Sequence, residues 1–443
     1  MSPTKPDPRG PATHPAPAVS DLTRRRALRA SLVGTVVEYY EFTIYGFLAV
    51  VFGPLFFPSA SPAAATLSAL TVYGAGYLAR PLGGVVWGVL GDRFGRRPIL
   101  MATLLVMGIA SSLIGVLPTY ASIGLAAPIL LLVLRLFAGF SAGGEWAGAL
   151  TYITEMAPPR KRGLYGSVPA MGVGIGFLSA ALVVALVSGS GLDMSTWGWR
   201  IPFLACIPLT VVCVALRYRL EDSPEFTAIA ESAEGVSRTP VRDTVRQHPL
   251  DVLRVIALTI GVLGPSTLGK LYIAIYLVQE KDFPPVQVYT LLGLALAATV
   301  WLFPVMGAKS DSIGRRPVAW LGLSASVILP VPLFLYVDSA GSLWAVLPVL
   351  LVYLLVEPFV SAAVFTSVAE FFPARTRFTG ISIGLNLGTI VAAGFGPAIA
   401  TSLVAATGWA GAPGVWGTAC AVIGLGALAV TRETNSPQDQ GSP

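Results

Sequence analysis

Charged residues are scarce in this chain. Only 12% of its 443 residues are Asp, Glu, Lys or Arg, whereas soluble domains carry about a quarter. Histidine is nearly absent, since His14 and His248 are the only two and both lie outside the apolar runs, which argues against a histidine-based catalytic centre. The sequence also has no plausible nucleophile–base set and no cofactor motif, so we do not expect an enzyme.

Cysteine is equally rare. The three cysteines, Cys206, Cys213 and Cys420, all lie inside apolar runs. Cys206 and Cys213 are seven residues apart, which places them on one face of a helix, where ordinary packing explains them. We therefore expect neither a disulfide framework nor a metal site.

What the chain does contain is a series of apolar runs over its whole length, and its mean hydropathy is +0.72. Runs of about 20 apolar residues are typical of helices that cross a membrane. The sequence therefore predicts an all-α membrane protein. We predict twelve transmembrane helices, at 29–53, 65–90, 98–117, 123–155, 163–187, 199–217, 252–278, 286–308, 317–337, 342–370, 378–404 and 409–430.

The basic residues lie mainly in the N-terminal tail and in every second loop between these spans. Because Lys and Arg are enriched in cytoplasmic loops, we predict that both termini are cytoplasmic and that the protein lies in the plasma (inner) membrane. The net charge of +6 is then an orientation signal at the lipid bilayer. No nucleic-acid partner is expected.

Two motifs recur at nearly the same spacing. "GDRFGRRP" (91–98) returns as "KSDSIGRRP" (309–317), and "EMAPPRKR" (155–162) returns as "EFFPARTR" (370–377). This indicates a duplicated six-helix unit, and since six is even, both copies have the same orientation, with substrate near the midplane between them. The predicted parts are a disordered cytoplasmic tail (1–28), a six-helix bundle (29–217), a cytoplasmic linker (218–251), a second six-helix bundle (252–430) and a cytoplasmic tail (431–443).

Seven charged residues lie in the interior of the predicted spans, away from their ends, although each costs about 2.5–3.5 kcal/mol at a helix centre. They are Glu38, Glu41, Arg80, Arg135, Glu145, Lys270 and Glu357. Six of the seven fall on spans 1, 4, 7 and 10, the first helix of each three-helix group. We predict that these helices line a central cavity, where the charges face water and substrate instead of lipid.

Depth along the helices predicts one ion pair. Glu38 lies roughly 14 Å from the start of span 1, and Arg80 roughly 15 Å from the end of span 2, at 1.5 Å per residue. Antiparallel neighbours bring them level, so we predict a Glu38–Arg80 pair, with Glu41 one turn higher on nearly the same face. The pair is either purely structural or a carboxylate whose proton affinity changes as the cavity opens.

Other buried charges favour a substrate site. Arg135 carries a permanently charged fork that suits carboxylate recognition. Lys270 and Glu357 form a candidate second pair, with Pro358 freeing a backbone carbonyl beside it; the alternative for Lys270 is snorkelling to the surface. Additional candidate substrate contacts are Arg80, Glu145, Tyr45 and Trp146.

Several motifs resemble the major facilitator superfamily. "GDRFGRRP" resembles its signature loop between helices 2 and 3, and "RLFAGFSAGGEW" resembles its helix-4 motif. "LARPLGG", "GWRIPF", "LEDSPEF" and the helix-1 stretch "GTVVEYYEFTIYGF" resemble the metabolite:proton symporter branch, which includes shikimate, 2-oxoglutarate, citrate and proline/betaine transporters. The resemblance covers residues 25–430 or thereabouts. It implies twelve helices in two parallel-repeat bundles that rock for alternating access, and proton-driven uptake.

The resemblance also implies a gate. In the superfamily the acid of the helix 2–3 loop, here Asp92, and its neighbouring arginines latch the outward-open state. The implied gating residues are Gly91, Asp92, Arg93, Gly95, Arg96 and Arg97, with Asp311, Gly314 and Arg315 in the second copy.

Some positions depart from the branch. Its helix 1 usually reads Trp-Tyr-Asp-Phe, where this chain has Tyr39, Tyr40, Glu41 and Phe42. We therefore expect the size of the substrate pocket, and with it the substrate, to differ from those of the other members of the branch. "GSVPAMGVGIG" lacks the Gly-Pro-x-x-Gly-Gly motif of drug/proton antiporters, which weakens an export function. The tail after 430 has no heptads, which disfavours the coiled-coil extension of osmosensing betaine carriers.

These features together predict a proton-coupled importer of a small organic anion, a carboxylate above all. Arg80, Arg135 and Lys270 supply positive charge, and Glu38 and Glu41 are the candidate proton carriers, with Arg80 and Arg135 as their partners in coupling. The alternatives are a symporter of a betaine-like zwitterion, a proton-coupled exporter, and a membrane sensor that does not transport. The only expected partners are substrate, protons and lipid, the proton gradient replaces any cofactor, and the protein is expected to be a monomer.

Overall fold

The computed structural model describes residues 21–58, 61–94, 96–218 and 240–434, and within these residues every regular element is a helix. The helices form twelve columns, one for each predicted span, so the predicted fold class is confirmed. The bounds of the columns, in chain order, are α1–α2 (Asp21–Phe47, Ala49–Phe56), α3–α4 (Pro62–Leu78, Arg80–Phe94), α5 (Arg96–Ile114), α7–α8 (Ala126–Ala142, Glu145–Met156), α9 (Arg162–Gly189), η2–α10–α11 (Met194–Gly198, Arg200–Leu204, Cys206–Arg217), α14–η3–α15 (Pro249–Thr267, Leu268–Tyr272, Ile273–Gln279), α16–α17 (Pro285–Thr299, Leu302–Ile313), α18–α19 (Arg315–Ile328, Pro330–Ser339), α20–α21 (Leu343–Leu354, Val356–Glu370), α22–η4–α23 (Ala374–Thr389, Ile390–Gly394, Gly396–Thr407) and α24 (Ala412–Ala429). Short helices α6 (Tyr120–Ile123), η1 (Pro159–Lys161) and α13 (Pro240–Gln247) connect them.

Most columns are apolar and long enough to cross a membrane. Among the described residues, eight pass as continuous helices by length and composition, and two more pass as bent pairs, α1–α2 with a bend of 57° and α18–α19 with a bend of 42°. The second bend falls at Pro330, whose ring removes one backbone N–H donor and crowds the preceding turn of the helix. The remaining two columns are α3–α4, which contains Arg80, and α5, whose apolar part is Met101–Ile114.

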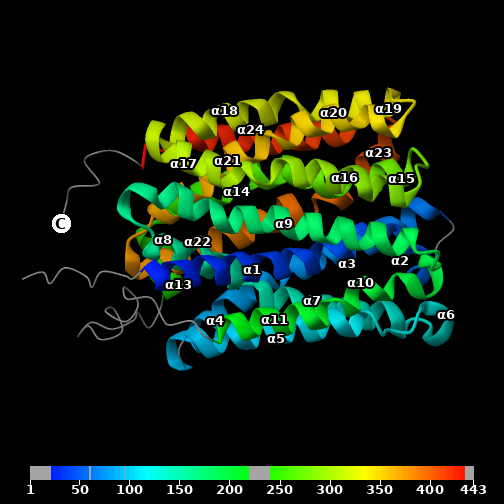
Figure 1. Ribbon diagram of the computed structural model, residues 1–443, viewed down its shortest axis with the longest axis horizontal. Helices are drawn as coiled ribbons and strands as arrows, with labels where there is room; N and C mark the ends of the chain where they lie inside the picture. Colours follow the sequence, from blue (N-terminus) through cyan, green and yellow to red (C-terminus); the bar gives the residue numbers. More distant parts are fainter. Residues whose placement is uncertain (1–20, 59–60, 95, 219–239, 435–443) are drawn as a thin grey trace, which may run out of the picture.

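The columns run side by side along the long axis of the molecule (Figure 1). Within the first six, α1 packs on α9, and α7 packs on α3 and α5; within the last six, α14 packs on α22 and α24, and α18 packs on α21. Contacts between the two groups run through α9 with α16, α17 and α21, and through α22 with α4 and α8. The start of α1 lies at the same end as α8 and α13, and α2, α6 and α15 lie at the other (Figure 1). The two helix groups therefore meet mainly along α9 and α22.

Several predicted boundaries need correction. Helix α1 begins at Asp21, so residues 21–28, predicted to be disordered, are helical; the run of Arg, Ala and Leu there consists of good helix formers. The predicted linker 218–251 contains α13 and the first turn of α14, which starts at Pro249.

Glycines of the helix-4 motif allow close helix packing, as their spacing predicts. A Cβ added at Gly139 would lie 1.8 Å from the carbonyl oxygen of Gly76, and one at Gly143 would lie 2.0 Å from that of Arg80. Both contacts join α7 and its C-terminal end to the column α3–α4. These glycines therefore set the distance between the two helices that carry Arg80 and Arg135.

We expect Gly139→Ala to destabilise the protein by roughly 1–3 kcal/mol, because the new methyl group overlaps backbone that cannot move alone. The control is Gly426→Ala, where an added Cβ meets nothing within 4 Å. Thermal unfolding of the detergent-solubilised protein should show a lower midpoint for the first variant and an unchanged or higher one for the second. Equal midpoints would contradict the proposed role of this glycine.

Candidate transport site

The predicted Glu38–Arg80 pair is present. Arg80 Nη2, on α4, donates to Glu38 Oε1, on α1, at 2.8 Å, and the side chains are 2% and 0% exposed. The Arg80 guanidinium also lies over the rings of Phe42 and Tyr77, at 4.2 Å and 4.6 Å from their centroids. Breaking a buried ion pair is strongly destabilising because it leaves one charge without its partner, so this pair holds α1 and α4 together.

Glu41 has a different environment from the one we predicted. It lies one turn beyond Glu38, but it faces α5, where Ser111 Oγ donates to Glu41 Oε2 at 2.8 Å. The other oxygen, Oε1, is buried and has no hydrogen-bond partner in the described structure. Glu41 is therefore a carboxylate buried against one neutral hydroxyl, whereas Glu38 has a cation. Glu41 thus lies one turn from Glu38, as predicted, but the two carboxylates have different partners.

Arg135 on α7 is buried inside an aromatic cage. Its guanidinium carbon lies 4.3 Å from the centroid of the Phe42 ring, 4.6 Å from that of Tyr45 and 5.2 Å from that of Tyr73. The side chain is fully buried, and none of its three guanidinium nitrogens has a hydrogen-bond partner within the described residues. Phe42 is thus shared by two cations, Arg80 and Arg135, and the second of these has no counter-ion there.

The cage includes residues that the sequence did not single out. Tyr45 was expected at the site and lies there, with its hydroxyl buried and unpartnered. Phe42 was noted only as part of the helix-1 motif, although it stacks on both arginines. The signal that could have revealed it is spacing, because Glu38, Phe42 and Tyr45 follow each other at helical steps of four and three residues.

Glu145 on α8 is already paired. Arg217, the last residue of α11, donates from Nη1 to Glu145 Oε2 at 2.8 Å, and its Nη2 contacts the other carboxylate oxygen. Glu145 was predicted as a substrate contact, but both of its oxygens face Arg217. No sequence pattern predicts this partner, because Arg217 is the last residue of its predicted span and resembles a charged residue of a loop.

Removing Arg217 should destabilise the protein strongly. We expect Arg217→Met to cost roughly 3–5 kcal/mol, because Glu145 then remains buried without a cation. The double variant Glu145→Gln/Arg217→Met should recover most of the loss, since it leaves no buried charge. Thermal unfolding of both purified variants tests this, and a single variant as stable as the unchanged protein would show that the pair contributes nothing.

Lys270 and Glu357 form the second pair in the other helix group. Lys270 Nζ donates to Glu357 Oε1 at 2.5 Å, and Ser266 Oγ donates to the same oxygen at 2.9 Å. The Lys270 side chain is 1% exposed, so it does not snorkel to the surface. Its ammonium lies 4.6 Å from the centroid of the Phe177 ring, on α9 of the first group. The lysine therefore lies at the boundary between the two groups.

Trp146, expected to line the site, lies at the same boundary. Its indole packs edge-on against Tyr39, with 5.8 Å between ring centroids, and against Phe365 on α21, at 4.6 Å. The indole Nε1 is buried without a hydrogen-bond partner in the described part of the chain. Trp146 therefore connects the two helix groups and leaves one donor available at their interface.

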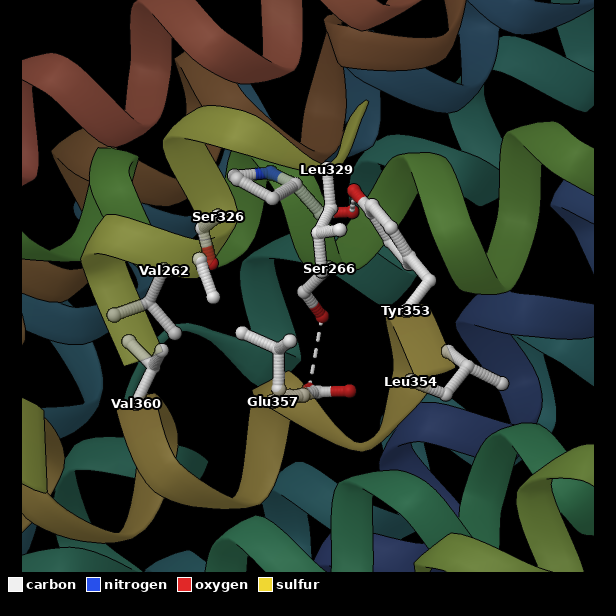
Figure 2. Close-up of a pocket in the computed structure, with 11 residues that line it drawn as sticks. Val262, Ser266, Ser326, Leu329, Tyr353, Leu354, Glu357 and Val360 are labelled. Atoms are coloured by element: carbon white, nitrogen blue, oxygen red, sulfur yellow. Dashed lines mark hydrogen bonds between the residues drawn. The ribbon is translucent and has the colours of Figure 1, made fainter. Parts of the chain in front are cut away.

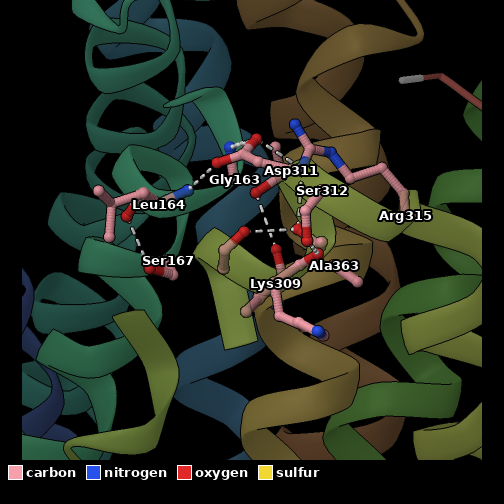
Figure 3. A network of polar contacts seen from close by, with 12 residues as sticks. Gly163, Leu164, Ser167, Lys309, Asp311, Ser312, Arg315 and Ala363 are labelled. Atoms are coloured by element: carbon pink, nitrogen blue, oxygen red, sulfur yellow. Dashed lines mark hydrogen bonds and ion pairs between the residues drawn. The ribbon is translucent and has the colours of Figure 1, made fainter. Parts of the chain in front are cut away.

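The second copy of the gating motif joins the two groups at one end (Figure 3). Asp311, on α17, accepts hydrogen bonds from the backbone N–H groups of Gly163 and Leu164 at 2.8 Å and 2.9 Å. These groups open α9, and a helix N-terminus favours a carboxylate. Arg315 donates to Asp311 at 2.8 Å, and Gly314 has φ of +101°, a conformation that favours glycine.

Further polar contacts lie at the same end of the molecule as the Asp311 cluster. Glu433 accepts from the backbone N–H groups of Arg315 and Arg316, both at 2.9 Å, and Arg377 on α22 lies 3.6 Å from Glu155 on α8. For the first copy the structure describes the backbone of 91–94 and 96–97 only, so the side chains of the implied gate there, and Gly95 itself, lie outside the described residues.

The described residues form twelve helical columns, most of them apolar and long enough to cross a membrane, with ion pairs buried inside each of the two helix groups and polar contacts joining the groups at one end. These are features of a membrane transporter. The family model described as Major Facilitator Superfamily matches residues 31–385. The chain belongs to that superfamily.

Two curated relatives agree with the branch that the motifs resemble. The shikimate transporter of Escherichia coli (strain K12) is 36% identical over 89% of this chain and 91% of its own length. The proline/betaine transporter of the same strain is 33% identical over 96% and 87%. The resemblance to metabolite:proton symporters is therefore confirmed.

A solved structure shows the same fold. The xylose transporter XylE from E. coli, in a partially occluded inward-open conformation, superposes with a TM-score of 0.71, over 94% of this chain and 99% of that chain. Its sequence identity is 17%, so this likeness establishes the fold alone.

Proposed function

We propose that the protein is a proton-coupled symporter that imports a small organic anion with a carboxylate group. The observation that carries this proposal is Arg135, a fully buried guanidinium without a hydrogen-bond partner in the described structure. A buried charge is costly unless it is paired. A substrate carboxylate supplies the missing counter-ion and matches the planar fork with two parallel hydrogen bonds.

The aromatic cage favours an anion over a zwitterion as the substrate. Cages of aromatic rings recognise quaternary ammonium groups through cation–π attraction. Here that position is taken by the protein's own cation, since the Arg135 guanidinium lies over Phe42, Tyr45 and Tyr73. A betaine head would have to compete with it, whereas a carboxylate is attracted to it. The geometry therefore supports the carboxylate.

We further propose that Glu41 binds a co-transported proton. It is a buried carboxylate held by one hydroxyl, and a carboxylate without a cation is stabilised by taking up a proton. With both termini cytoplasmic in the inner membrane, Glu41 would be protonated from the acidic outer side and release its proton to the more alkaline cytoplasm. Glu38, which Arg80 neutralises, is the weaker candidate.

Uptake into proteoliposomes tests this function. Purified protein should accumulate labelled shikimate, a monocarboxylate, when the outside is made acidic, and should not accumulate glycine betaine under the same gradient. Accumulation of betaine alone would favour the zwitterion symporter. Loading of inside-out vesicles on acidification of their lumen would favour an exporter, and binding without any flux would favour a sensor.

A further inference from the structure

A short amphipathic helix, α13, lies at the end of the molecule where α1 begins (Figure 1). Val241 and Val245 share one face of it, because residues four apart lie one above the other on a helix, and they are 36% and 44% exposed. Arg242 and Arg246 each follow one of these valines and are exposed too. Neither arginine has a hydrogen bond or an ion pair within the described residues. We expect this end to be cytoplasmic, which makes α13 a basic helix with an apolar face at the inner surface of the bilayer.

The apolar face of α13 borders a groove between the two helix groups. This groove measures about 240 Å³ and is lined by α4 of the first group, by α13 and by α22 of the second group. Its lining includes Gly88 of α4, where the nearest atom that an added Cβ would meet is Phe378 Cε1, at 3.6 Å. No ionisable side chain of the described residues lines it. The groove is therefore an apolar surface that both helix groups share.

Two other hollows lack this combination of features. The hollow beside Glu357 measures about 20 Å³ (Figure 2), which is room for one water molecule. The hollow beside Lys309 measures about 550 Å³, but its lining comes from α17, α18 and α21, all in the second helix group. Of the three, the groove under α13 is the one that combines an apolar lining, contact with both helix groups and two unpaired cations at its edge.

We propose that this groove binds an anionic phospholipid, with an acyl chain against α4 and α22 and the phosphate group at Arg242 and Arg246. Apolar surface at the boundary of the bilayer is covered by acyl chains, and basic side chains on the cytoplasmic side attract anionic headgroups. A zwitterionic lipid offers the same acyl chain, but the cation in its headgroup cancels the charge of its phosphate. The two arginines therefore select the anionic lipid.

The position of the groove gives the bound lipid a consequence for the protein. Helices α4 and α22 belong to different groups and are packed together in this structure. A ligand that contacts both helices stabilises the arrangement in which they lie side by side, by mass action. The lipid therefore favours the conformation in which the two helix groups are in contact at this end.

Competition between phosphatidylglycerol and phosphatidylcholine with identical acyl chains tests the role of the headgroup. Native mass spectrometry of the full-length protein in detergent identifies the first lipid molecule retained. The unchanged protein should prefer phosphatidylglycerol roughly 10- to 30-fold, the size expected for two basic residues near the membrane surface. Arg242→Gln/Arg246→Gln should retain the two lipids equally.

The matched control is Arg160→Gln/Lys161→Gln, which removes two exposed basic residues of η1 at the same end of the molecule and should keep the preference. A preference that survives in Arg242→Gln/Arg246→Gln, or one that is lost equally in the control, would show that phosphatidylglycerol binds to the basic end in general. Either result overturns the proposed site.

A second variant tests the acyl chain. Gly88→Leu places a side chain in the groove and leaves both arginines in place, so retention of the first lipid should fall roughly tenfold or more. Gly426→Leu is the control, because an added Cβ there meets nothing within 4 Å, and it should retain lipid normally. Unchanged retention by Gly88→Leu overturns the proposal. Phosphatidylglycerol should also raise the unfolding midpoint of the unchanged protein, and an equal rise with millimolar inorganic phosphate would show a site for a soluble anion instead.

Discussion

Replacing Arg135 with glutamine should abolish carboxylate transport while leaving the protein at least as stable as before. The two effects separate because Arg135 is a buried cation without a counter-ion among the described residues. Removing it deletes an uncompensated charge, which is neutral or favourable for folding. It also deletes a bidentate, charge-assisted contact with the substrate, so the Kd for shikimate should rise roughly 100-fold or more.

Three variants make this prediction sharp. Arg135→Lys keeps the charge but loses the planar fork, so it should bind with intermediate affinity. Arg254→Gln removes a partly exposed arginine at the start of α14 that pairs with Asp251, and it should transport normally. Thermal unfolding and proteoliposome uptake are measured for each. The prediction is contradicted if Arg135→Gln is strongly destabilised or still binds shikimate tightly. Arg135 would then stabilise the aromatic cage and would not bind the substrate.

Much of the fold follows from the sequence because the bilayer imposes a simple rule. Each span must satisfy its own backbone hydrogen bonds in lipid, so helices of sufficient apolar length are the available solution. The predicted spans therefore all correspond to helical columns. Errors occur at the ends, where polar residues continue a helix beyond the apolar run, as at Asp21 and Pro249. No hydropathy pattern marks such an end.

The pairs were predictable to different degrees for a geometric reason. Glu38 and Arg80 lie at equal depth on consecutive helices, and the constant rise of a helix is enough to bring them together. Glu41 requires the rotation of α1 about its axis and the position of α5, which together place Ser111 beside it. Neither quantity is contained in spacing along the chain.

Two features of the site could be identified only from the three-dimensional structure. Arg217 pairs with Glu145 across 72 residues, and its place at the end of a span gives it the appearance of a loop residue. The absence of any hydrogen bond or ion pair at Arg135 among the described residues is a property of all its neighbours at once, so no motif encodes it. The structure separates the charged residues that form ion pairs from Arg135 and Glu41, which form none there.

The second large effect on transport is expected from replacing Glu41. Glu41→Gln should change the proton stoichiometry without unfolding the protein, because glutamine can still accept the hydrogen bond from Ser111 Oγ. With one proton on Glu41, the unchanged protein carries one proton per monocarboxylate, so transport is electroneutral. With Glu41 replaced, the anion enters without a proton, and one negative charge enters per cycle.

An acidic exterior should therefore drive shikimate accumulation into proteoliposomes of the unchanged protein and not of Glu41→Gln. An imposed membrane potential, negative inside, should leave the unchanged protein unaffected and oppose uptake by Glu41→Gln. Glu38→Gln is the comparison, since it leaves Arg80 without its carboxylate and should lower thermal stability by roughly 3–5 kcal/mol. Accumulation by Glu41→Gln that still follows the pH gradient would show that Glu41 carries no coupled proton.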